Sequence, residues 1–224
     1  MRADRPRSDR ECAVRGPVSV MRAAIGAILV LLSGCGGAGS ATGTGQSAAP
    51  TGPGGGNALV PPGYGTLTQA EFTLELGIGD LQIQITPLAE SVIRLAAPDT
   101  YQRLTGLAAS ASSSLGSRAP EESPLFLVSM FSRAPTVTYE PENLHIVNSG
   151  LRYRPIAIQA ITPGWGGQRL RQEETQIAVY AFDVGIDLEI ALTVEYEGAR
   201  DTSWERILRQ LELERARVRA RIRS

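Results

Sequence analysis

From Gln69 onward, apolar and polar residues alternate along the chain with a period of two. Residues 72–76 and 81–85 show this pattern on either side of Gly77-Ile78-Gly79-Asp80. Successive side chains of a strand point to opposite faces, so the alternation indicates strands with one face in a core and the other in water. Because glycine favours tight turns, the two runs predict a β-hairpin.

The same analysis predicts nine short strands separated by Gly, Pro and Asn. They are expected at 72–76, 81–85, 92–95, 124–131, 136–139, 144–147, 151–161, 176–183 and 186–196. Residues 124–131 are apolar on both faces, which suits a central strand, and 186–196 alternate most regularly. His145 lies between two apolar residues and is therefore expected to face solvent. This pattern predicts a mainly β fold, an antiparallel sandwich of Ig-like or transthyretin-like architecture.

Two segments have helical spacing instead. Residues 99–112 predict one short internal helix that begins at Asp99. Residues 201–224 predict a C-terminal amphipathic helix, in which Thr202-Ser203-Trp204-Glu205 has the sequence of a capping box. This segment holds seven Arg and four acidic residues. Its Arg-rich end is either simply solvated, which the wide angular spread of the arginines favours, or an arm for anionic lipid or an acidic partner.

The N-terminal region has the pattern of an export signal. Residues 23–32 form an uncharged apolar run after Arg22, and ten residues are too few to span a bilayer. Leu32-Ser33-Gly34-Cys35 follows directly. These four residues resemble the lipobox of bacterial lipoproteins. The resemblance implies cleavage before Cys35, with Leu32, Ser33 and Gly34 recognised by the signal peptidase, and a lipid on Cys35. Met21, next to Arg22, is expected to be the true start.

Residues 36–65 contain 11 Gly, 4 Pro and no charged residue. Such a segment buries too little apolar surface to offset its chain entropy, so it predicts a flexible linker. The expected organisation is a signal region at 1–34, a lipidated cysteine and linker at 35–65, a sandwich domain at 66–200 and the helix at 201–224. The expected location is the cell envelope. By resemblance, Gly36 rather than Asp after the cysteine favours the outer membrane.

Composition excludes several kinds of chemistry. All 22 basic residues are Arg, so lysine-dependent catalysis and P-loop binding are impossible. With two Cys and one His, a Cys/His zinc site has too few ligands. No G-x-S-x-G motif occurs, and the net charge of −1 does not favour nucleic acid. We therefore expect no metal, no cofactor, no nucleic-acid partner and no catalytic residues.

A glycine-rich loop gives the clearest binding hypothesis. Trp165 lies among glycines and precedes Arg169 and Arg171, and exposed Trp and Arg on loops are common contact residues. Alternatively, Trp165 folds back onto the core. The predicted function is non-enzymatic binding or scaffolding of another envelope protein. The alternatives are a hydrolase that uses paired carboxylates (Glu121/Glu122, Glu140/Glu142 or Glu173/Glu174) and a binder of small apolar ligands.

Overall fold

The computed structural model describes residues 59–224, which belong to the compact unit Pro53–Ser224. Its strands are β1 Leu74–Ile78, β2 Leu81–Pro87, β3 Leu125–Ser132, β4 Thr136–Thr138, β5 His145–Asn148, β6 Leu151–Tyr153, β7 Pro155–Ala160, β8 Arg169–Arg171, β9 Thr175–Phe182, β10 Leu192–Tyr196 and β11 Ala199–Asp201. Its α-helices are α1 Glu90–Ile93, α2 Pro98–Leu115 and α3 Trp204–Arg223. Short 3-10 turns occur at η1 Gln69–Phe72, η2 Gly116–Arg118, η3 Pro141–Asn143 and η4 Trp165–Gly167.

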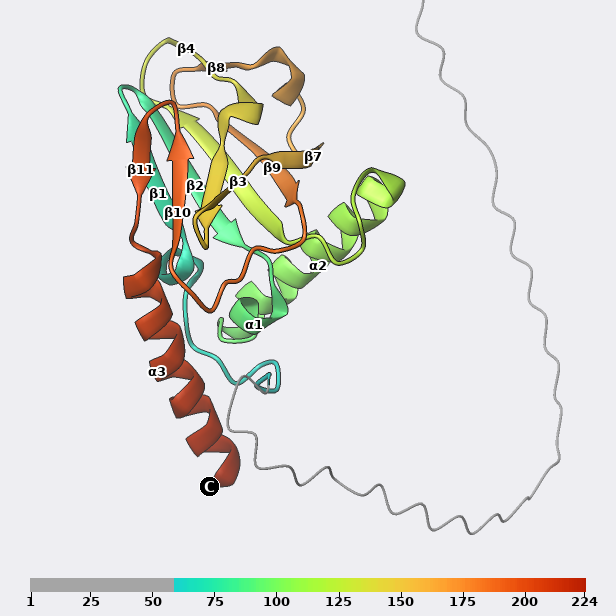
Figure 1. Cartoon of the computed structure of the whole chain (residues 1–224), viewed down its shortest axis with the longest axis vertical. Helices are drawn as coiled ribbons and strands as arrows, with labels where there is room; N and C mark the ends of the chain where they lie inside the picture. The colour runs from blue at the N-terminus through green and yellow to red at the C-terminus, as the bar shows by residue number, and fades with distance from the viewer. Residues whose placement is uncertain (1–58) are drawn as a thin grey trace, which may run out of the picture. The chain divides into compact units, whose positions relative to one another are not determined.

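The strands form two main antiparallel sheets in a β-sandwich-like arrangement (Figure 1). One sheet has the order β1-β2-β3-β9-β7, the other has the order β11-β10-β5-β6, and β4 and β8 form a separate ribbon. On one side of the sandwich, the amide of Glu75 in β1 donates to Asp201 of β11 at 3.0 Å. The predicted mainly β, antiparallel fold is thus confirmed.

The hairpin and the central strand agree with the sequence. Leu74 pairs with Ile85 and Leu76 with Ile83, and all four side chains are buried. β3 lies in the middle of its sheet and is buried or half-buried along its whole length. The apolar residues therefore face the space between the sheets, as the period of two requires.

Several predicted elements differ from the structure. Residues 92–95 lie in and after helix α1, because the amides of Val92 and Ile93 donate to the carbonyl of Ala89 in a helical turn. The predicted strand 151–161 is divided at Arg154 into β6 and β7, which belong to different sheets. Its apolar residues belong to two different sheets, and an alternation with a period of two does not show where the chain passes from one sheet to the other.

The segment with the most regular alternation, 186–196, forms a shorter strand than the sequence predicts. Only Leu192–Tyr196 of the predicted strand 186–196 forms β10. Residues 186–190 instead form a loop whose Leu188 carbonyl accepts a bond from the indole of Trp204 at 3.1 Å. Glu189 in the same loop binds Arg215. Tertiary contacts with α3 thus replace the pairing that the pattern predicts.

Both predicted helices exist. α2 covers the predicted 99–112 and extends beyond it at both ends. α3 begins at Trp204 and buries Trp204, Ile207, Leu211 and Val218. The predicted capping box is wrong: Ser203 makes no side-chain cap bond, and its amide and hydroxyl instead donate to the carboxylate of Asp201.

Trp165 is a core residue, 7% exposed. Its ring lies 5.5 Å from that of Tyr139 and 6.0 Å from that of Tyr180, with edge-to-face geometry in both contacts. The Tyr139 hydroxyl lies within hydrogen-bonding distance of the Gln176 side-chain oxygen and of the Trp165 carbonyl, and can donate its one hydrogen to either. Of the two interpretations, the structure therefore agrees with the one in which Trp165 folds back.

Trp165→Ala should lower the melting temperature substantially, because truncation of a buried Trp costs about 3–5 kcal/mol. For a domain of this size, the expected drop is roughly 6–20 °C. Arg169→Ala, at an exposed neighbouring position, should change stability by no more than about 0.5 kcal/mol. Thermal unfolding followed by circular dichroism measures both, and an unchanged melting temperature for Trp165→Ala would contradict the core assignment.

Candidate functional site

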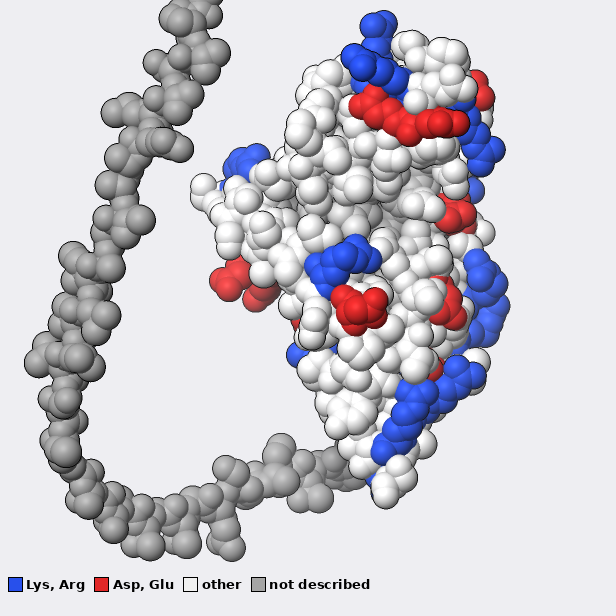
Figure 2. Space-filling view, turned by 180° about the vertical axis from the view of Figure 1, so that it is seen from behind, with Lys and Arg blue, Asp and Glu red and all other residues white. Residues whose placement is uncertain are grey.

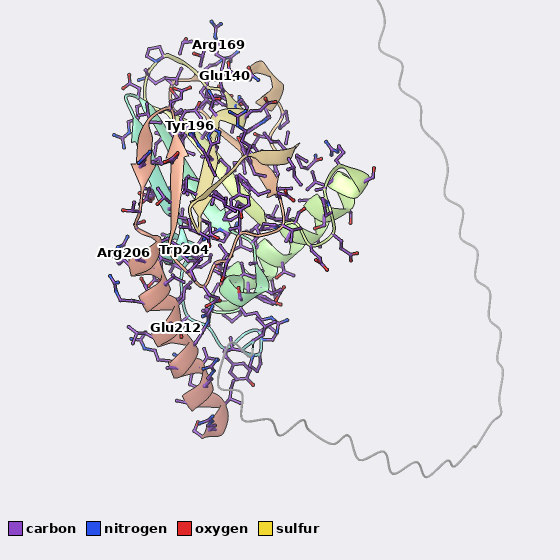
Figure 3. The ribbon with its side chains drawn as sticks, viewed as in Figure 1. Glu140, Arg169, Tyr196, Trp204, Arg206 and Glu212 are labelled. Atoms are coloured by element: carbon purple, nitrogen blue, oxygen red, sulfur yellow. The ribbon has the colours of Figure 1, made fainter. Side chains whose placement is uncertain are left out.

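The residues predicted to bind a partner are divided between core and surface. Leu170 is fully buried, so its neighbours Arg169 and Arg171 on β8 point outward and are exposed. They lie on the β4–β8 ribbon, at the end of the domain opposite to the C-terminus of α3 (Figures 1 and 3). Because Trp165 is buried, the two arginines are the exposed part of the predicted binding site. Their role in binding stays a prediction.

The predicted lipidation site lies outside the described residues, and so do Leu32, Ser33 and Gly34. The described chain begins within the predicted linker, where Val60 is already buried. Among residues 59–224, no helix has both the length and the apolar character needed to cross a bilayer.

One of the carboxylate pairs predicted for a hydrolase, Glu121/Glu122, lies in a groove that other acidic residues also line. Glu121 and Glu122 line an open groove of about 560 Å³ between α1, α2 and the 186–189 loop. Two other acids of this groove already have partners, Glu90 with Arg94 and Glu189 with Arg215. Within the described chain, no cluster of three or more His, Cys, Asp or Glu residues could hold a metal ion. A hydrolase that uses these carboxylates stays a prediction.

The free edge of β7 is the feature that the sequence analysis did not find. β7 pairs with β9 on one side, and no strand of the described chain pairs with its other side, although helix α2 contacts part of β7. No residue from 155 to 161 is charged, and Ile156 and Ile161 are 43% and 41% exposed. Natural edge strands are usually protected by charged side chains, bulges or short length, because their unpaired backbone groups attract other strands. Here Pro155 and the irregular pairing beside it protect only the start of β7.

A groove of about 590 Å³ lies along this strand and has two arginines beside it. Its lining comes from β7 and from Arg118, Glu142, Asn143 and Arg154. The Arg118 guanidinium donates to the Ser114 carbonyl and to the Gln159 side chain, at 2.9 and 2.8 Å. Among the described residues, neither Arg118 nor Arg154 forms an ion pair with a carboxylate within 4.0 Å. Their positive charge is thus available to a ligand beside β7.

His145 holds one of these arginines. The prediction that His145 faces solvent is wrong, because the side chain is only 6% exposed. Its Nδ1 lies 2.7 Å from the Asn143 carbonyl, and its Nε2 accepts from Arg154 Nε at 3.2 Å. Burial lowers the pKa of His145, and the charges of Arg152 and Arg154 lower it further. The neutral ring can therefore accept the Arg154 hydrogen bond near neutral pH.

A sequence signal for this site exists but is weak. The segment Pro155-Ile156-Ala157-Ile158-Gln159-Ala160-Ile161 is uncharged and begins with Pro. Pro within strands occurs mainly at edges or strand starts. However, the absence of a neighbour for β7 depends on long-range pairing, which local periodicity does not report.

Comparisons of this chain with protein-family models, with curated proteins and with solved structures found no match.

Proposed function

We propose that this protein is a lipid-anchored cell-envelope protein that binds an extended segment of another envelope protein at the free edge of β7. The observation that carries the binding proposal is the uncharged, unpaired edge of β7 beside a groove with two arginines. The anchoring proposal rests on Leu32-Ser33-Gly34-Cys35 at the end of an apolar run. The outer membrane is the proposed location, because Gly36 rather than Asp follows Cys35.

Strand addition fits this edge in three respects. The backbone groups of β7 that face away from β9 can pair with an incoming strand, which gives affinity without a deep pocket. The exposed side chain of Ile156 gives apolar contact. Arg118 and Arg154 favour a segment that carries a carboxylate next to its apolar residues.

The predicted linker suits such a role. Leu59, where the described chain begins, lies 24 positions after Cys35. A Gly-rich coil of this length has a typical reach of about 25–30 Å. The lipid would keep the domain at one membrane surface, while the linker would let β7 find a partner within that distance.

The anchor is tested by metabolic labelling with an alkyne analogue of palmitate in a bacterial host. The wild-type chain should incorporate the label and fractionate with membranes. Cys35→Ser should lose the label and accumulate as the uncleaved precursor, because no other residue of the motif can be acylated. Ser33→Ala, which keeps a small residue in the motif, is the matched control and should behave like wild type. Labelling and processing of Cys35→Ser like those of the parent would refute the anchor.

The β7 edge is tested by a photo-crosslinking amino acid at the exposed position 160 in intact cells. The expected adduct contains one copy of this chain and one other envelope protein. Ile156→Lys should reduce its yield at least about tenfold, because a charged side chain on an edge strand opposes pairing. Ile190→Lys is the control, since Ile190 is similarly exposed, 39% against 43%, but lies away from β7.

Two results would contradict the partner assignment. One is an adduct whose yield is equal with Ile156→Lys and Ile190→Lys. The other is an adduct with twice the mass of this chain, which would show that β7 pairs with a second copy.

A further inference from the structure

The end of the domain at which the described chain begins also carries the C-terminal end of α3. The Thr66 amide and hydroxyl donate to Glu214 of α3 at 3.1 and 2.9 Å. Arg221 donates to the Tyr64 carbonyl at 2.6 Å, and Arg94 to the Val60 carbonyl at 3.4 Å. Four separate contacts thus hold residues 60–66 against α1 and α3 (Figure 1).

This end is positively charged. Residues 215–224 contain five Arg and no acidic residue. Arg215 is buried and bound to Glu189 and Glu212, whereas the four arginines that follow are exposed. Among residues 59–224, Glu214 is the one acidic residue within ion-pairing distance of Arg217 and Arg221, at 3.3 and 3.4 Å. Figure 2 shows basic side chains along the edge that leads to this end, and others at the opposite end.

Exposed apolar side chains accompany the arginines. Leu59 and Tyr64 are each 50% exposed, and Ile222 is 45% exposed. We call these three residues, with Arg217, Arg219, Arg221 and Arg223, the basic end. Arginine with exposed aliphatic and aromatic side chains is the composition of surfaces that lie in the interface of anionic membranes.

We propose that the basic end binds the headgroups of anionic phospholipids. The inference rests on the proposed lipid at Cys35, which would bring the protein to a membrane. The linker would then lead from that membrane to Leu59, which belongs to the basic end. A single lipid anchor on a flexible linker limits the distance of a domain from a bilayer but leaves its orientation free. A polybasic surface adds a second signal and turns one end of the domain toward the lipid.

The experiment uses unlipidated protein, residues 36–224, which include the whole compact unit. Co-sedimentation is measured with vesicles of phosphatidylcholine alone and with vesicles that also contain phosphatidylglycerol. Binding is expected only to the second kind, and it should disappear near 1 M salt, where the screening length falls to about 3 Å.

A pair of double variants localises the binding. Arg219→Gln with Arg223→Gln should lower the partition coefficient roughly 30-fold, from the usual contribution of an arginine near an anionic surface. These positions leave the two arginines that contact buried Glu214 in place. The matched control, Arg169→Gln with Arg171→Gln, removes the same charge from the opposite end and should change binding no more than about twofold.

Three outcomes would overturn the inference: no binding to phosphatidylglycerol vesicles at low salt, equal binding to both kinds of vesicle, or equal losses in the two double variants. Since the protein tested has no lipid, none of these outcomes bears on Cys35. Conversely, loss of labelling at Cys35 would refute the anchor and leave the vesicle result standing.

Discussion

A buried carboxylate, Glu214, ties the beginning of the described chain to its C-terminal helix. Its side chain is 0% exposed, and a buried charge is tolerated only when it is paired and hydrogen-bonded. Thr66 supplies two donors, and Arg217 and Arg221 supply the positive charge. The entry of the chain into the domain and the arginine-rich end of α3 are therefore held on one surface. The position of the proposed tether relative to the rest of the fold follows from this arrangement.

The same helix shapes the region next to it. Arg215 reaches Glu189 through two bonds of 2.6 and 2.7 Å, and the Trp204 indole binds the Leu188 carbonyl. These contacts hold residues 186–190 as a loop against α3, so strand β10 begins only at Leu192. At the other side of the sandwich, no strand of the described part of the chain lies beyond β7. The proposed lipid-binding surface and the proposed strand-binding edge thus lie on different parts of the fold.

Local patterns predicted much of this architecture and missed what depends on distant contacts. The hairpin of β1 and β2, the central strand β3 and the amphipathic α3 follow from periodicity, because each buries one repeating face. The division of 151–161 between two sheets depends on long-range pairing, and the short β10 depends on contacts with α3. Residues 92–95 form a local helical turn, and a short apolar run does not distinguish such a turn from a strand. The same limit applies to sites. Arg169 and Arg171 are exposed as expected, whereas Trp165 and His145 are buried by residues remote in sequence.

The account predicts a definite orientation, and electron paramagnetic resonance of single spin labels measures it most directly. Ile222→Cys and Thr136→Cys place spin labels at exposed positions on opposite ends of the domain. Each labelled, lipidated protein is bound to vesicles that contain phosphatidylglycerol and lipids with nickel-chelating headgroups. The account predicts strong relaxation of the label at position 222 and little at position 136. Equal relaxation at the two positions, or stronger relaxation at position 136, would contradict it.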